Sequence, residues 1–457
     1  MADYLDILSE FLADVSFDDI PGKVIDHAGL VFADTLGCIA AGSREPDMAA
    51  MRVTIGSRSS GPAVVIGDTQ MRSRETAALL NASAGTYHEL DEGNRYARGH
   101  PAIHVIPALL AQAAVEETDG RTFITAIILG YETAVRLGSA MRMRTGAHPH
   151  GTWGTVGAAV ALGTLLGYDA KRFRTAINIA TTHSILPSGV AVIEGATAAL
   201  TYPGVGCRQA FLVTDILAAG LTAQHDAPTT VYGQLLSESF DPGVVMESLG
   251  VRWEIARNYF KRFACVRYAH GLLDALEKVI TELPNRRLDA TAIRRIEARA
   301  HIPVGRLTEA APANPLAARV SIPFALATYI VAGDAGLGGF TQASVNDPRI
   351  RNLASKIDVV EDPNFTAQMP AKRPSQITIE FNDKRTLIAS GEHIRGDPEA
   401  PLTLNELRAK FELLTAGSWP AETAEAIWRS CLNIGEHNDV SALTNQLVAA
   451  ACTSACS

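Results

Sequence analysis

Apolar residues recur at helical spacing through the first part of the chain. Leu5, Leu8, Phe11 and Leu12 lie three or four residues apart, and the same spacing continues after Pro21. Pro21 suits the first turn of a helix, where its missing N–H is not needed. Small residues are dense in the segments that follow, which indicates helices buried on more than one face. We therefore predict a helical bundle over residues 1 to about 260, with helices at 76–86, 104–117, 122–140, 154–166 and 205–221.

The pattern changes after about residue 285. Apolar and polar residues alternate over 295–302, and they alternate more cleanly over 376–381. Three polar residues follow, and 386–389 then supplies the second arm of a hairpin. Between these strands lies an Ala-rich segment, 317–331, that is typical of a helix. We therefore predict a mixed α+β region here, followed by helices at 403–415, 421–433 and 438–451.

Composition narrows the function classes. The chain has 457 residues, 47% of them hydrophobic, which excludes wholesale disorder and indicates two or three domains. Its 40 basic and 49 acidic residues give a formal charge of −9. Proteins that bind nucleic acid through its phosphates usually carry a basic surplus, so we predict no nucleic-acid partner.

The sequence also favours a cytoplasmic protein without a membrane segment. The most apolar run, 155–166, is much shorter than the roughly 18–20 residues that span a bilayer. The N-terminus has no positive region followed by an apolar stretch, so we expect no signal peptide. Six cysteines are scattered along the chain, which is typical of cytosolic thiols rather than of a disulfide framework.

The densest group of ionisable residues is the loop 87–101, which interrupts two apolar helical segments. It contains carboxylates, histidines and arginines, including Asp91, Arg95, Arg98 and His100. Together such groups bind anionic substrates and move protons. The alternative is a solvated loop with ordinary surface ion pairs, which contribute little.

Two further clusters carry candidate chemistry. His148 and His150 precede a Gly/Ala-rich helix, whose N-terminal dipole would lower the pKa of a histidine and whose amides can hold a carboxylate. The alternative is that they cap or pack. Lys261, Arg267 and His270 could hold a polycarboxylate, or they could form a basic helix face in solvent.

Signals for metals, cofactors and a cysteine nucleophile are weak. His100 and His104 are four residues apart, but Pro101 and the lack of a paired Glu spoil the zinc-protease pattern. The glycines do not form a dinucleotide fingerprint after a strand. Cys265 has no evident histidine–acid pair beside it. We predict no metal and no cofactor.

The three clusters, in this order, resemble the MmgE/PrpD family, which includes 2-methylcitrate dehydratase, cis-aconitate decarboxylase and iminodisuccinate epimerase. The resemblance covers nearly the whole chain. It is carried by Asp34-Thr35-Leu36-Gly37-Cys38, His88-Glu89-Leu90-Asp91, His100-Pro101, Gly130-Tyr131-Glu132, His148-Pro149 with Gly154-Thr155-Val156-Gly157, Lys261-Arg262-Phe263 with His270, and Ala318-Arg319-Val320-Ser321-Ile322-Pro323-Phe324.

The resemblance implies a fold that is mainly α with an α+β second domain. Residues 1–264 plus 400–457 would form a large all-helical domain from both ends of the chain, and 265–399 an inserted α+β lid domain. It also implies a homodimer and a cofactor-free reaction on a small anionic carboxylate, at a carbon next to a carboxylate group.

Four catalytic positions carry over from the family. Its active-site aspartate falls on Asp91, its loop histidine on His100, the histidine before the glycine-rich helix on His148, and the lid-motif lysine on Lys261. Removing a proton beside a carboxylate needs a base and cations that neutralise the growing charge. His148 is a candidate base and His100 a candidate acid.

The chain departs from the family at several positions. The usual second aspartate and hydroxyl residue are absent after Asp91. The usual lysine of a Gly-Thr-x-Thr-Lys segment is Ala199, and the histidine near it is Tyr202. The common tyrosine of the lid segment is Phe324, and Val266 stands where the decarboxylase has histidine. These changes argue against identifying the chain as a standard 2-methylcitrate dehydratase or a standard cis-aconitate decarboxylase.

The remaining candidates are substrate-binding residues: Arg95, Arg98, His150, Arg267 and His270. Arg95 or Arg98 could supply the charge of the missing lysine, with the different geometry of a guanidinium.

Three hypotheses follow from these residues. The first is a dehydratase-like lyase on a small hydroxy-polycarboxylate. The second keeps the proton abstraction but gives an epimerase or isomerase, with decarboxylation a further variant. The third is a binding homologue that has lost activity. Ala199 and Phe324 suggest it, and the retained ionisable residues oppose it: Asp91, His100, His148 and Lys261.

Overall fold

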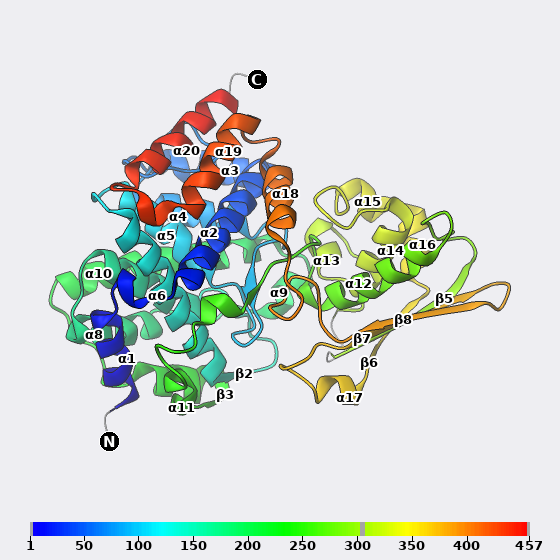
Figure 1. Ribbon diagram of the computed structural model, residues 1–457, viewed down its shortest axis with the longest axis horizontal. Helices are drawn as coiled ribbons and strands as arrows, with labels where there is room; N and C mark the ends of the chain where they lie inside the picture. Colours follow the sequence, from blue (N-terminus) through cyan, green and yellow to red (C-terminus); the bar gives the residue numbers. More distant parts are fainter. Residues whose placement is uncertain (1–2, 302–306, 455–457) are drawn as a thin grey trace.

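The computed structural model describes residues 3–301 and 307–454, and it is mainly helical with a smaller share of strand (Figure 1). The longer helices are α1 (Tyr4–Asp14), α2 (Gly22–Ser43), α3 (Pro46–Thr54), α4 (Arg74–Gly85), α5 (Ala102–Ala113), α6 (Gly120–Ala140), α7 (Trp153–Leu165), α8 (Ala170–Thr182), α10 (Tyr202–Ala218), α12 (Arg267–Glu282), α14 (Ile322–Ala332), α18 (Leu404–Thr415), α19 (Ala421–Leu432) and α20 (Ser441–Ser454). The short helices are α9 (Gly189–Ile193), α11 (Pro242–Met246), α13 (Pro315–Arg319), α15 (Gln342–Asn346), α16 (Pro348–Ala354) and α17 (Pro363–Thr366).

Eight strands form three sheets. The strands are β1 (Gly93–Asn94), β2 (Met141–Met143), β3 (Ser237–Phe240), β4 (Asn258–Tyr259), β5 (Ile293–Ala300), β6 (Ile357–Glu361), β7 (Ser375–Phe381) and β8 (Thr386–Gly391). The largest sheet has the order β6-β5-β7-β8, in which β5 is parallel to β6 and antiparallel to β7. The other two sheets are the pairs β1–β4 and β2–β3.

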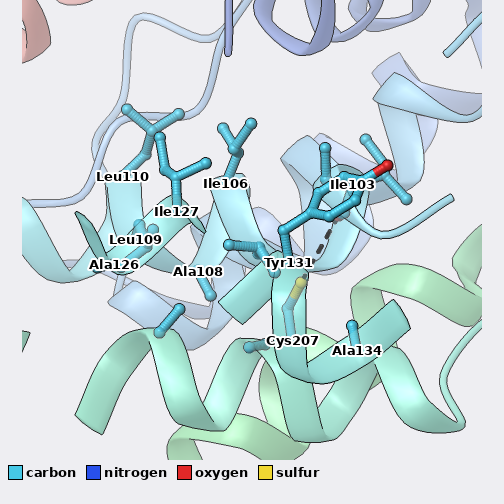
Figure 2. Close-up of a cluster of buried hydrophobic side chains, with 14 of the residues drawn as sticks. Ile103, Ile106, Ala108, Leu109, Leu110, Ala126, Ile127, Tyr131, Ala134 and Cys207 are labelled. Atoms are coloured by element: carbon cyan, nitrogen blue, oxygen red, sulfur yellow. Dashed lines mark hydrogen bonds between the residues drawn. The ribbon is translucent and has the colours of Figure 1, made fainter. Parts of the chain in front are cut away.

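The two ends of the chain share one helical body. The early helix α2 packs against α4 and also against the late helices α18 and α19, so N-terminal and C-terminal segments lie side by side (Figure 1). Figure 2 shows part of its apolar core, where Ile103 and Leu109 of α5 face Ile127 and Tyr131 of α6, with Cys207 of α10 beside them. Close packing of this kind requires the small residues that the sequence supplies.

A second apolar core lies around the four-stranded sheet. α12 packs on β5, β7 and β8, and α14 packs on α12 and α16. Inward residues of the strands alternate with outward ones, as in β7, where every second residue is buried. This core and the helical body meet between β4 and α12, the stretch that contains Lys261.

Most of the predicted elements are confirmed, including the helices of the bundle and the β7–β8 hairpin. The prediction of a single helix over the Ala-rich segment 317–331 is wrong, because this segment contributes to two helices, α13 and α14. Ser321 interrupts it as the N-cap of α14, where its hydroxyl accepts the N–H of Phe324 at 3.1 Å. A serine at this position favours a new helix start over continuation.

The helical part is not wholly helical, which corrects the all-helical prediction. β1 pairs with β4, and β2 pairs with β3. Strands of two to four residues are too short for alternation to reveal them, and their partners lie far away in the sequence. The predicted boundaries of the two domains stay predictions.

The prediction that no apolar segment is long enough to span a membrane needs a correction. α2 has the length and hydropathy to cross one. Within the structure 78% of its apolar window is buried, as in the central helix of a bundle. The four cysteines with described side chains, Cys38, Cys207, Cys265 and Cys431, are free and buried, as predicted.

Candidate active site

Two tethers bring the three polar clusters of the sequence together. β1, within the loop 87–101, pairs with β4 so that Gly93 faces Tyr259, and Lys261 follows directly. On α5, Nε2 of His104 accepts the N–H of Gly151 at 2.9 Å, which holds the segment of the second cluster against the loop. Nδ1 of His104 donates to the carbonyl of His100 at 3.0 Å.

Asp91 and His100 form the centre of the site. Nδ1 of His100 lies 3.0 Å from Oδ2 of Asp91 and 2.7 Å from the carbonyl oxygen of Glu92. A carbonyl can only accept, so Nδ1 carries the proton and Nε2 is left for a substrate. Burial lowers the pKa of His100, but the charge and hydrogen bond of Asp91 together with the charge of Glu89 outweigh it, and the pKa is raised. Burial raises and His100 lowers the pKa of Asp91, and the net shift is downward.

Lys261 is fully buried beside this pair. Its Nζ donates to the carbonyl of Glu89 at 2.9 Å and to Oε2 of the same residue at 3.0 Å. An ammonium has three donors, so one remains for a ligand. Burial lowers the pKa of Lys261, but Glu89 and Asp91 outweigh it and raise the pKa overall. The lysine therefore stays charged.

Three histidine rings continue the cluster. The ring centroid of His150 lies 4.6 Å from that of His148 and 5.1 Å from that of His100. Burial lowers the pKa of His148 to about 4, and it lowers the pKa of His150 as well. The dipole of the next helix was predicted to keep His148 neutral. The largest cause of its lowered pKa is instead its burial. Nε2 of His150 is buried without a hydrogen-bond partner among the described residues.

Two helices that begin close to these residues in the sequence have no capping side chain. α7 begins after Thr152 and α12 begins after Val266, and neither of these residues caps its helix through its side chain. Free N–H groups at a helix start bind anions, and the dipole adds to the attraction. The start of α7 follows His150 closely in the sequence, and the start of α12 follows Lys261.

A separate group of arginines lies close to Tyr259. Nη2 of Arg267 donates to Oδ1 of Asp397 at 2.7 Å, and Nη1 lies 3.2 Å from Nδ1 of His270. Nη1 of Arg95 donates to Oε2 of Glu399 at 2.9 Å. The guanidinium of Arg267 lies 4.4 Å from the ring centroid of Tyr259, whose ring is 6.4 Å from that of His100.

The nine candidate residues are therefore not equivalent. The structure gathers Asp91, His100, His148, His150 and Lys261 into one cluster, and it places Arg95, Arg267 and His270 in the adjoining arginine group. Arg98 is separate, because its side chain is exposed and makes no hydrogen bond or ion pair with any residue of 3–301 or 307–454.

A cavity of about 180 Å³ lies beside one of the positions that depart from the family, Ala199. Thr197 and Leu200, on either side of the buried Ala199, line it together with Tyr87 and Arg319. Nη2 of Arg319 lies 2.9 Å from Nδ1 of His88, a residue of the loop. Arg319 therefore lines the same cavity as the neighbours of Ala199, whereas Arg98 does not line it.

Sequence reasoning missed two supporting contacts. Nζ of Lys410, on α18, donates to the carbonyl of Leu90 at 2.8 Å and pairs with Oδ1 of Asp34 at 2.6 Å, which holds the loop next to Asp91. Asp34 stands in a quoted motif, but nothing marks Lys410, which lies 320 residues from Leu90. Glu92 is a structural acid: it accepts from Ala102 N–H at 3.0 Å, and burial raises its pKa to about 7.

Among residues 3–301 and 307–454 there is no group of three or more His, Cys, Asp or Glu side chains that could hold a metal ion. The cluster offers a histidine with a lowered pKa, a histidine with a raised pKa and a buried ammonium in one place. Such a set can accept a proton, donate a proton and neutralise a carboxylate.

Comparisons with known proteins match nearly the whole chain. The MmgE/PrpD N-terminal domain model matches residues 6–241, and the MmgE/PrpD C-terminal domain model matches 263–434. The chain is 28% identical to the cis-aconitate decarboxylase-like protein oryM of Aspergillus oryzae, over 95% of each chain. It is 24% identical to the cis-aconitate decarboxylase of Aspergillus terreus, over 96% of this chain and 95% of the relative. It is 25% identical to the human cis-aconitate decarboxylase, over 93% of this chain and 90% of the relative.

Proposed function

Because the chain belongs to the MmgE/PrpD family, we propose that it is a lyase that acts on a small polycarboxylate by removing a proton next to a carboxylate group. One observation carries this proposal: His148 and His100 have pKa values shifted in opposite directions, and both rings contact His150. Two titratable groups whose environments separate their pKa values in this way are suited to act as base and acid.

His148 acts as the base. With a pKa of about 4 it is neutral at physiological pH, and its Nδ1 accepts the N–H of His150 at 3.3 Å. Nδ1 is therefore the unprotonated nitrogen, and it takes the proton from the substrate carbon in place of this long hydrogen bond. The electron pair left on that carbon moves toward the adjoining carboxylate, where negative charge accumulates.

Lys261 and His100 complete the reaction. The free N–H of Lys261 neutralises the accumulating charge, an electrostatic contribution that is large in a buried site. Nε2 of His100 donates its proton to a hydroxyl on the neighbouring carbon. The C–O bond breaks, and the products are an alkene and water. On a hydroxy-polycarboxylate the chain is therefore a cofactor-independent, dehydratase-like lyase.

Decarboxylation is the second candidate, and the names of the relatives favour it. Here the electron pair of a C–CO₂⁻ bond leaves CO₂ and passes to the unsaturated substrate, and His100 protonates the carbon. The same cluster serves both reactions, because each needs a proton donor and cations around a carboxylate. Return of the abstracted proton to the opposite face would instead give an epimerase.

The test is an assay in D₂O with citrate, 2-methylcitrate, malate and cis-aconitate, followed by NMR and by CO₂ release. We expect an alkene from a hydroxy acid or CO₂ from cis-aconitate. His148→Gln should lower the rate by about 10²–10⁴-fold, the usual contribution of a general base. The control is His225→Gln, whose side chain is 82% exposed and which should retain the full rate.

Each outcome has a defined meaning. Water loss supports the dehydratase, CO₂ release supports the decarboxylase, and deuterium at the substrate carbon without net reaction supports the epimerase. If no substrate reacts or exchanges deuterium, the lyase proposal is overturned.

A further inference from the structure

Five arginines are buried in the described structure, and they differ in how their charge is matched. Arg136, Arg95 and Arg267 each form an ion pair with a carboxylate, and Arg319 contacts His88. Arg373 is only 6% exposed, yet its side chain makes no hydrogen bond or ion pair within 3–301 and 307–454. Its Nε is buried without a partner. Taking a guanidinium out of water without a counter-charge is strongly unfavourable.

The backbone around Arg373 is held by two hydrogen bonds. Arg373 N–H donates to the carbonyl of Glu392 at 3.0 Å, and Nδ1 of His301 donates to the carbonyl of Pro374 at 3.1 Å. These contacts anchor the start of β7. The hairpin turn of β7 and β8 projects away from the helical body, so this strand start is at the end of the sheet nearer to that body (Figure 1).

Tyr259 connects Arg373 to the proposed active site. The guanidinium of Arg373 lies 5.4 Å from the ring centroid of Tyr259, and that of Arg267 lies 4.4 Å from it. The same ring is 6.4 Å from the ring of His100. Arg373 is therefore one aromatic ring away from the proton donor.

The local charges leave one cation unmatched. Arg95, Arg267 and Arg373 share Asp397, and Arg95 also pairs with Glu399, so this group has three guanidinium groups and two carboxylates. Oδ1 of Asp397 is taken by Arg267, and its Oδ2 has no hydrogen-bond partner in the described residues. The nearby imidazoles of His270 and His301 add no charge, since burial lowers the pKa of each.

We propose that Arg373 binds a second carboxylate of the substrate, distant from the reacting carbon, and so selects polycarboxylates over monocarboxylates. This inference rests on the proposed function. A guanidinium holds a carboxylate through two parallel N–H···O bonds, and a ligand carboxylate would supply the missing negative charge. Tyr259 would separate this subsite from His100 and fix the distance between the two carboxylates.

The experiment measures binding of two probes that cannot eliminate water: tricarballylate, with three carboxylates, and butyrate, with one. For Arg373→Met we expect the Kd for tricarballylate to rise by about 10- to 100-fold, as for the loss of hydrogen bonds to a charged group. The Kd for butyrate should stay within twofold. The melting temperature should not fall, because an unmatched buried charge has been removed.

Two further variants keep the test decisive. Arg373→Lys retains the charge but not the fork, so its tricarballylate affinity should lie between those of the wild type and Arg373→Met, even if the latter folds poorly. Arg385→Met, in the exposed β7–β8 turn, is the matched control and should bind like the wild type. Equal tricarballylate affinity in all variants, or a lower melting temperature with unchanged affinity, would assign Arg373 a structural role and overturn the inference. Failure of the proposed function appears differently, as a wild type that turns over none of the four assay substrates.

Discussion

Two buried ionic groups in this molecule have opposite characters. On α6, Nε of Arg136 pairs with Glu132 at 2.7 Å, and its Nη atoms donate to the carbonyls of Val245, Glu247 and Arg252. In the candidate active site, Asp91 lies 3.0 Å from His100, yet neither carboxylate oxygen accepts a well-aligned hydrogen bond from a described residue.

The difference separates a structural network from a reactive one. Arg136 and Glu132 use their hydrogen-bonding capacity to hold α6 against the chain segment after α11, and Glu132 also accepts the N–H of Glu254 at 2.6 Å. Burial raises the pKa of Glu132 to about 7, so a shifted pKa alone does not identify a catalytic group. Unfilled hydrogen-bonding capacity next to separated pKa values is the better criterion.

The largest effect should come from Asp91→Asn. The amide keeps the shape of the side chain but removes the charge that favours protonated His100. We expect the turnover rate to fall by about 10²–10⁴-fold, the range of general acid–base contributions, with little loss of stability. Steady-state rates with the best substrate of the proposed assay, together with a melting curve, measure both quantities.

The matched control is Glu92→Gln, because Glu92 is the neighbouring acid but serves Ala102 and Tyr131 structurally. Glu92→Gln should lower the melting temperature and have little effect on the turnover rate. If both variants lost turnover rate to a similar extent and kept a normal melting curve, Glu92 could not be separated from Asp91 as a purely structural acid.

The second effect concerns the structural network. Arg136→Met leaves Glu132 buried without its cation, and we expect the free energy of unfolding to fall by about 3–5 kcal/mol, as for one partner of a buried pair. The activity of the remaining folded protein should be close to normal. Urea unfolding followed by circular dichroism measures the change.

The double variant Glu132→Met with Arg136→Met tests the reason. Removing both charges avoids the uncompensated carboxylate, so the double variant should be more stable than Arg136→Met alone. Equal destabilisation in the two proteins would mean that packing, and not charge, governs this network.

Sequence patterns predicted the fold well where elements are long and regular. Apolar spacing located α2, α5 and α6, and alternation located β7 and β8. The short strands β1 to β4 escaped, because each is specified by a distant partner rather than by its own residues. For the same reason nothing local marked β6, which pairs in parallel with β5.

The candidate site was predictable to the extent that its residues stand in motifs. Asp91, His100, His148 and Lys261 each occur in a dense polar run, and the structure gathers them. Lys410 could not be found in this way, since its contact with Leu90 exists only in the folded chain. Arg373 likewise looks like any surface arginine until its burial and its missing partner are seen.

The smallest predicted effect is on the pH dependence of turnover, and it tests whether the two histidines act as assigned. Activity requires neutral His148 and protonated His100, so kcat/KM should fall below a pH of about 4, where His148 gains a proton. It should also fall at alkaline pH, at a value above the ordinary 6.5 of histidine, because the pKa of His100 is raised. In Asp91→Asn the residual activity should begin to fall on the alkaline side at a lower pH than it does in the wild type. Burial and Lys261 both lower the pKa of His100 once the charge of Asp91 is gone. The measurement is the residual rate of this variant across pH with the assay substrate. If the pH of the alkaline fall does not change, the group that titrates there is not His100 under the influence of Asp91.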